Sequence, residues 1–118
     1  MDKGIDLYKH FIDELVKMSE NCIDANNVKK GVFIGDVSKK EGMDAVLQKL
    51  SDEDRTNLAA FVSDVYTAGI FDVLDYLEWL RECKNMEIRI EDTALAMDEF
   101  EGIQNDYIGR RQGWQWNK

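Results

Sequence analysis

The residues of this sequence that could act on a ligand are acids on one helix and basic and aromatic residues at the chain end. The segment FDVLDYLEWLRE puts Asp72, Asp75, Glu78 and Glu82 on neighbouring turns of a helix. The segment DYIGRRQGWQWNK closes the sequence with arginines, aromatic residues and glycines. The residues that could form a partner or ligand site are Asp72, Asp75, Tyr107, Arg110, Arg111, Trp114 and Trp116.

The acidic helix has two interpretations. Such a face is most often simply solvated. A functional face would make Asp72 and Asp75 anchors for the C-terminal arginines or for a basic partner. Di-iron carboxylate bundles also place acids on helices, but they need Glu-x-x-His pairs, which this sequence lacks.

The C-terminal segment has three interpretations: a nucleic-acid tail, a partner-binding tail, or a strap that folds back onto the protein. Arginine and aromatic side chains can stack on single-stranded nucleic acid. However, a chain with net charge −9 is a poor match for phosphates, so we expect no nucleic-acid binding. The sequence favours the strap, in which Trp114 and Trp116 become buried. Arg110 and Arg111 would then bind the acidic segment 72–82 or a β-hairpin predicted within segment 86–110. Uncovered tryptophans would instead form a partner-binding pair.

The residues needed for common catalytic sites are missing. His10 is the only histidine, so neither a usual zinc site nor a supported nucleophile–histidine pair can be built. The glycine-containing stretch GVFIGD lacks the Gly-Lys-Ser/Thr ending of a phosphate loop. We therefore expect no metal and no cofactor, and favour a non-enzymatic function. The enzyme or ligand-binding alternative requires a pocket where Asp72 or Asp75 meets Tyr107 and Arg110.

Composition indicates an acidic, globular, cytoplasmic protein. Residues 51–103 hold fourteen acidic and four basic residues, so a basic protein is the partner that this charge would suit. No uninterrupted apolar run approaches the length of a membrane span, and the N-terminus lacks a secretion signal. Cys22 and Cys83 are expected as buried free thiols, with a disulfide between them as the minor alternative.

The periodicity predicts an α+β fold that is mostly α, in one domain spanning residues 1–118. Its body is bundle-like, with four to five helices, including segments 3–25, 39–50, 52–66 and 70–83. Gly69 is the expected site of a bend between the last two. Segment 86–110 is predicted as β-rich, either an antiparallel hairpin or a three-stranded meander, and the tail 111–118 as folded back.

Helix starts are clearly marked. Asp2 is a candidate N-cap, Ser38 and Glu41 have capping-box spacing, and Ser51 repeats the device. The stripe expected to be buried in the second helix consists of Met43, Val46, Leu47 and Leu50. The loop before that helix is expected to insert Val32, Phe33 and Ile34 into the core.

Residues 50–116 resemble a family of small bacterial proteins of unknown function. The family pattern has a Leu-Ser-acid helix start, then Asp-Val-Leu-x-Tyr-Leu, then a late Asp-aromatic-x-x-Arg followed by glycine and tryptophan. The matching residues are Leu50, Ser51, Asp72, Val73, Leu74, Tyr76, Leu77, Asp106, Tyr107, Arg110, Gly113 and Trp114 or Trp116. The proline that follows the last tryptophan in the family is absent here. The resemblance implies a helical N-terminal part and no known activity.

Together these features predict a protein that acts by binding. The expected partner is a basic protein, in an immunity- or antitoxin-like role typical of this size and charge. A homodimer through the long helical segment is a further possibility. No membrane association is expected.

Overall fold

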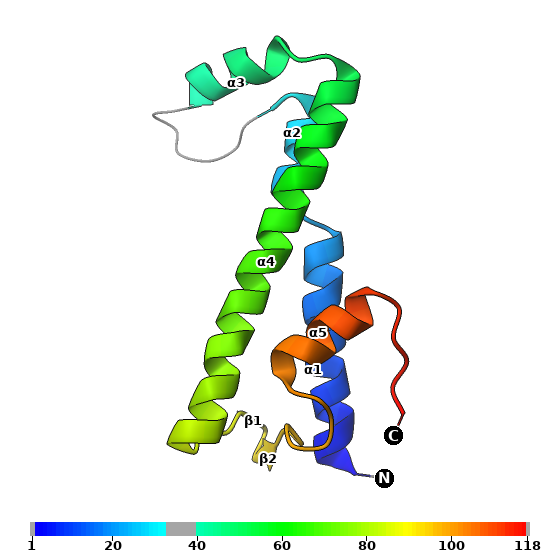
Figure 1. The fold of residues 1–118 in the computed structure, drawn as a ribbon, viewed down its shortest axis with the longest axis vertical. Helices are drawn as coiled ribbons and strands as arrows, with labels where there is room; N and C mark the ends of the chain where they lie inside the picture. The colour runs from blue at the N-terminus through cyan, green and yellow to red at the C-terminus, as the bar shows by residue number, and fades with distance from the viewer. Residues whose placement is uncertain (1, 33–39, 118) are drawn as a thin grey trace. The chain divides into compact units, whose positions relative to one another are not determined.

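The computed structural model describes residues 2–32 and 40–117 and shows a mostly helical α+β fold (Figure 1). Its elements are α1 (Lys3–Glu20), α2 (Ile23–Lys30), α3 (Lys40–Gln48), α4 (Asp52–Lys84), β1 (Arg89–Ile90), β2 (Thr93–Ala94) and α5 (Ile103–Arg111). The chain forms two compact units, one of residues 1–18 and 69–118 and the other of residues 19–68. The predicted fold class is therefore confirmed.

The first predicted helix is in fact two helices. Asp2 caps α1, because its carboxylate accepts a hydrogen bond from the backbone N–H of Ile5 at 3.2 Å. The helix ends at Glu20, and Cys22 takes an extended conformation before α2 begins. The predicted range 3–25 is wrong at this point. Apolar periodicity continues across the break, so the pattern alone could not reveal that Cys22 leaves the helical conformation.

The unit of residues 19–68 has a small core. Cys22 and Ala25 pack with Ala59 of α4, and partly buried Val28, Val62 and Tyr66 surround them. Gly31 ends α2 in the left-handed conformation (φ 83°), and its carbonyl accepts a hydrogen bond from Gln48 Nε2 at 2.8 Å. The buried members of this core, Cys22, Ala25 and Ala59, all have small side chains.

Helix α3 buries less of its stripe than predicted. Leu47 is fully buried, but Met43 and Val46 are exposed, so the expectation that these two residues are buried is wrong. The apolar spacing marks the helix correctly, yet it cannot show whether another element covers that stripe. Phe33, Ile34 and Ser38, assigned above to a core contact and a capping box, lie outside the described residues.

Helix α4 is one helix of 33 residues. Ser51 caps it by accepting a hydrogen bond from the N–H of Asp54 at 3.0 Å, as predicted. The expected interruption between residues 66 and 70 is wrong, because residues 67–69 are helical. Gly69 nevertheless marks the position where α4 passes from one compact unit to the other.

Helix α4 also meets a length and composition test for crossing a membrane. It contains an 18-residue stretch that is sufficiently apolar and carries no more than two charged residues. The sequence prediction considered only uninterrupted apolar runs, so it missed this stretch, which is interrupted by charged residues. Length and composition alone are weak evidence, since a core helix of a soluble protein passes the same test.

A two-residue turn closes the small sheet. Strands β1 and β2 are antiparallel, with Arg89 opposite Ala94 and Ile90 opposite Thr93. Glu91 and Asp92 both have positive φ, 48° and 68°, as a tight hairpin turn requires. The predicted hairpin is therefore confirmed. The prediction that segment 86–110 is β-rich is wrong, because only residues 89–90 and 93–94 of it form strands. The third strand of the meander alternative is also wrong, because residues 103–111 form helix α5.

The larger core lies in the unit of residues 1–18 and 69–118. It joins α1, the C-terminal half of α4, the segment after β2, and α5 through Tyr8, Ile12, Val16, Leu74, Leu95, Met97, Ile103 and Tyr107. The backbone of α1 comes close to the segment after β2: the N–H of Ala96 donates to the carbonyl of Gly4 at 3.1 Å. In Figure 1 the chain after α5 runs back along α1.

Candidate functional site: an acidic helix face and its polar supports

The exposed side of α4 carries carboxylates beside aromatic rings. Asp72, Asp75, Tyr76 and Trp79 have the spacing i, i+3, i+4 and i+7, which places them on one side of the helix. We call these four residues the acidic–aromatic face. Tyr76 and Trp79 stack with ring centroids 6.2 Å apart, although they are 59% and 48% exposed. The two rings are therefore held together and remain open to a partner.

The rings of this face suit cations. Lys84 Nζ lies 5.7 Å from the centroid of Trp79, a cation–π contact within the chain. Asp72 and Asp75 are exposed, and Asp75 accepts a hydrogen bond from Gln104 Nε2 of α5 at 3.2 Å. Helix α5 thus holds one of the two carboxylates in position.

Glu78, by contrast, points into the protein and is 6% exposed. It binds the guanidinium of Arg81 and accepts a hydrogen bond from the N–H of Ile103, at the N-terminus of α5, at 3.4 Å. The hydrogen bond from Arg81 lowers the pKa of Glu78. Glu78 is therefore not solvated like the other acids of this segment. The spacing of the acids in the sequence cannot show that Glu78 is the one that faces the N-terminus of α5.

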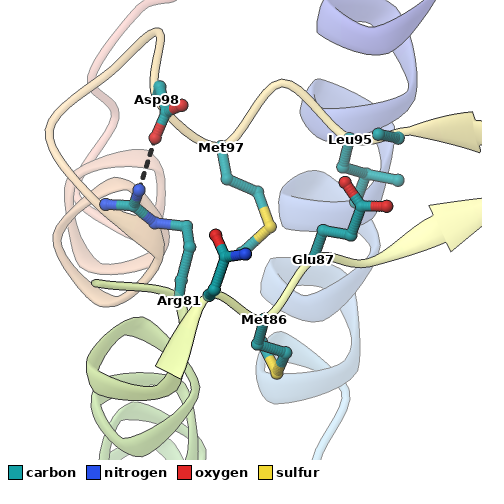
Figure 2. A pocket seen from close by; sticks show the side chains of 8 residues that line it. Arg81, Met86, Glu87, Leu95, Met97 and Asp98 are labelled. Atoms are coloured by element: carbon teal, nitrogen blue, oxygen red, sulfur yellow. Dashed lines mark hydrogen bonds and ion pairs between the residues drawn. The ribbon is translucent and has the colours of Figure 1, made fainter. Parts of the chain in front are cut away.

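Arg81 lies at one end of a pocket of about 490 Å³ (Figure 2). The pocket is lined by Arg81, Asn85, Met86, Glu87, Ala94, Leu95, Met97 and Asp98. Arg81 forms ion pairs with Glu78, Asp98 and Glu82, and these partners, chiefly Glu78, raise the pKa of the guanidinium. In Figure 2 Met97 lies between the Arg81–Asp98 ion pair and Glu87. Of the residues named in this paragraph, the sequence singled out only Glu78 and Glu82, and neither of them lines the pocket.

A second polar contact is fully buried between α1 and α5. The hydroxyl of Tyr8 donates to Asp106 Oδ2 at 2.5 Å, and the N–H of Glu101 donates to Asp106 Oδ1 at 3.2 Å. Burial raises the pKa of both side chains, most strongly that of Tyr8. Both residues are inaccessible, so the contact joins two helices rather than presenting groups to a ligand.

The C-terminal segment binds α1. Arg110 donates to both carboxylate oxygens of Asp13, through Nε at 2.8 Å and Nη2 at 3.2 Å, and Trp116 Nε1 donates to Oδ2 at 3.2 Å. Arg110 also donates to the carbonyl of Trp114. The expectation that Arg110 binds the acidic segment 72–82 or the hairpin is therefore wrong. Asp13 gave no distinguishing signal, because it lies among alternating charges on α1.

The tryptophans of this segment form an aromatic cluster with Phe100. The centroid of Phe100 is 4.8 Å from that of Trp116 and 6.3 Å from that of Trp114, and Trp116 also contacts Tyr8 edge-on. Trp114 and Trp116 are both half-buried. These two candidate residues therefore belong mainly to the packing of the larger unit.

The seven candidate residues thus separate into several places. Asp72 and Asp75 lie on the acidic–aromatic face, whereas Tyr107 is fully buried and its hydroxyl has no hydrogen-bond partner among the described residues. Arg111, near the end of α5, is half-buried. The pocket described above is lined by none of the seven.

The remaining reactive residues are dispersed. Within residues 2–32 and 40–117 no group of three or more histidine, cysteine or acidic side chains is placed to hold a metal ion. His10 is exposed and 4.0 Å from Glu14. Both cysteines are free, but only Cys22 is buried, so the expectation of a buried thiol is wrong for Cys83.

Comparison with known proteins identifies a family for this chain but no activity. No curated protein and no solved structure matches the chain. One family match covers residues 1–118 and is described as a family of unknown function. The chain belongs to that family, DUF6547.

Proposed function

We propose that this protein is a non-enzymatic, cytoplasmic interaction protein that binds a basic protein partner through the acidic–aromatic face of α4. The observation that carries the proposal is the exposed Tyr76–Trp79 stack beside the exposed carboxylates of Asp72 and Asp75 on α4. Aromatic residues dominate binding energy in protein interfaces, and carboxylates steer a basic partner towards them. The contact of Lys84 with Trp79 supports a preference for cations at this face.

The charge of the chain supports the same partner class. The net charge is −9, and the acids are concentrated in residues 51–103. A small acidic protein of this kind suits an immunity- or antitoxin-like role, in which it covers a basic surface of its target; this is an analogy of size and charge. The enzyme alternative receives less support, because Tyr107 is buried and Arg110 binds Asp13 rather than Asp72 or Asp75.

The test uses a charge-reversed face and a matched control. The face variant carries Asp72→Lys and Asp75→Lys, and the control carries Glu20→Lys and Asp64→Lys, two exposed acids outside the face. Affinity capture from the native host with the unmodified protein should recover a stoichiometric basic protein. Its affinity, measured by calorimetry, should fall by at least about tenfold for the face variant and little for the control.

Raised salt should weaken the complex, because exposed charge pairs are screened. A captured partner that binds both variants equally would contradict the use of this face. Light scattering of the isolated protein tests the homodimer: a stable dimer lost on Tyr76→Ala would assign the face to a second copy instead.

A further inference from the structure

The pocket beside Arg81 has the size of a ligand site. Its volume of about 490 Å³ falls within the range of small-molecule pockets, roughly 300–1,000 Å³. Its lining comes from the end of α4, the segment leading to β1, and the segment that starts at β2. All of these residues belong to the same compact unit, so the pocket is a feature of that unit alone.

The charges around Arg81 disfavour an anion as the ligand of this pocket. One guanidinium is shared by three carboxylates, those of Glu78, Asp98 and Glu82. Of these three, only Asp98 lines the pocket, and Glu78 and Glu82 contact the same guanidinium from outside the lining. The charge around Arg81 is therefore negative overall. At Glu87 the charge is balanced, because Arg89 Nε donates to its carboxylate at 2.6 Å. A carboxylate or phosphate would be repelled, and a cation attracted.

One acceptor at the negative end is open. Asp98 Oδ1 pairs with Arg81, but Oδ2 has no hydrogen-bond partner among the described residues, and the side chain is 84% exposed. An ammonium or guanidinium group can donate to that oxygen. The negative end thus offers both charge and a hydrogen-bond acceptor.

Apolar side chains form only part of the rest of the pocket lining. Leu95 and Met97 are buried beneath it, and Met86 is half-buried. Methionine side chains are unbranched and polarisable, so they adjust to irregular apolar groups. A chain of methylene groups can lie on this surface with its charged end at Asp98.

We infer that this pocket binds an aliphatic chain ending in a cation, the chemistry of a lysine or arginine side chain. This inference rests on the proposed function in one respect: the side chain is taken to belong to the basic partner. The pocket would then receive one basic residue of that partner, separately from the contacts on the acidic–aromatic face.

The probe is Nα-acetyl-lysine methylamide, titrated into protein labelled with carbon-13 at the methionine methyl groups. We expect saturable shifts of the methyl signals of Met86 and Met97, with affinity in the millimolar range, about what a single side chain provides. Met18 and Met43 are exposed and outside the pocket lining, so their signals serve as internal controls. The matched uncharged probe, Nα-acetyl-norleucine methylamide, should produce much smaller shifts.

Two variants assign the cation to Asp98. Asp98→Asn should weaken binding of the lysine probe by about tenfold, as expected for one lost charge-assisted hydrogen bond. Asp6→Asn is the control, because Asp6 is an exposed acid of α1 in the same unit and belongs neither to the pocket lining nor to the acidic–aromatic face. It should leave the affinity unchanged.

Several results would overturn the inference. These are no saturable shift at Met86 and Met97, equal shifts with the norleucine probe, or equal shifts at Met18 and Met43. Spermidine distinguishes a free polyamine: if it saturates the pocket while the lysine probe does not, the ligand is not a protein side chain. A negative result in this titration does not contradict the proposed role of the acidic–aromatic face. That proposal is tested separately, with the variant carrying Asp72→Lys and Asp75→Lys.

Discussion

The hydroxyl of Tyr8 donates a hydrogen bond to Asp106 Oδ2 at 2.5 Å, across 98 positions of sequence and without contact with solvent. This bond joins α1 to α5 in the middle of the larger core. Asp106 is polar and fully enclosed, so its carboxylate depends on Tyr8 and on the N–H of Glu101 for its hydrogen bonds. The two helices therefore have a specific polar link in addition to their apolar packing.

Tyr8→Phe should lower the free energy of unfolding by about 1–3 kcal/mol, because it leaves a buried carboxylate with one fewer donor. Tyr107→Phe is the matched control. Tyr107 is equally buried, but its hydroxyl has no partner among the described residues, so its removal should be neutral or slightly stabilising. Urea unfolding of both variants measures the difference. Equal losses would show that the Tyr8–Asp106 bond contributes nothing specific.

Asp106 and Tyr107 show what the sequence could and could not predict. The resemblance pattern includes both Asp106 and Tyr107, and we placed Tyr107 in a candidate ligand site. Nothing in the local pattern shows that residue 106 is bonded to residue 8. Period and capping are local properties, so the N-caps Asp2 and Ser51 and the antiparallel hairpin were predicted correctly.

The wrong predictions share a physical cause, because each depends on which helix or strand packs against a given residue in the folded protein. Residues 103–111 alternate enough to resemble a strand, but α1 and α4 enclose Ile103 and Tyr107, and the segment is a helix. The sequence contains many acidic residues that could pair with Arg110. The position of Arg110 in α5 places its guanidinium within hydrogen-bond distance of Asp13. Of the candidate residues, only Asp72 and Asp75 remain exposed on the acidic–aromatic face.

Glu78→Gln should lower the free energy of unfolding at neutral pH more than at acidic pH. The pKa of Glu78 is lowered by its hydrogen bond from Arg81, so its contribution is present above the unfolded pKa, near 4.3, and is lost as the pH falls through the lower folded pKa. We expect a loss of about 2 kcal/mol at pH 7 that narrows below about pH 4. Thermal unfolding at several pH values measures it.

The exposed neighbour Glu82 provides the control for this experiment. It also pairs with Arg81, at 3.5 Å, but its side chain is 61% exposed. Glu82→Gln should therefore change stability by less than about 1 kcal/mol at any pH, as is usual for surface ion pairs. A constant loss for Glu78→Gln across the acidic range would contradict the ion-pair explanation.

Asp13→Asn should loosen the C-terminal segment. Asp13 accepts hydrogen bonds from Arg110 and Trp116, and the neutral amide can replace only part of this bonding. We expect a loss of about 1–2 kcal/mol and greater quenching of tryptophan fluorescence by acrylamide. Glu14→Gln, an exposed change at the next position of α1, should alter neither quantity. Unchanged quenching in Asp13→Asn would show that Asp13 does not hold Trp116 in place.

Two glycine substitutions should have opposite effects. A Cβ at Gly4 would lie 2.8 Å from the carbonyl oxygen of Ala94, so Gly4→Ala must displace backbone and should destabilise the protein by at least about 1 kcal/mol. A Cβ at Gly69 meets nothing within 4 Å, and its backbone is helical. Gly69→Ala should therefore stabilise it by about 0.5–1 kcal/mol, because alanine has the better helix propensity. Chemical unfolding of both variants measures the change in the free energy of unfolding. A lower stability of Gly69→Ala would show that α4 requires a glycine at the position where it passes from one compact unit to the other.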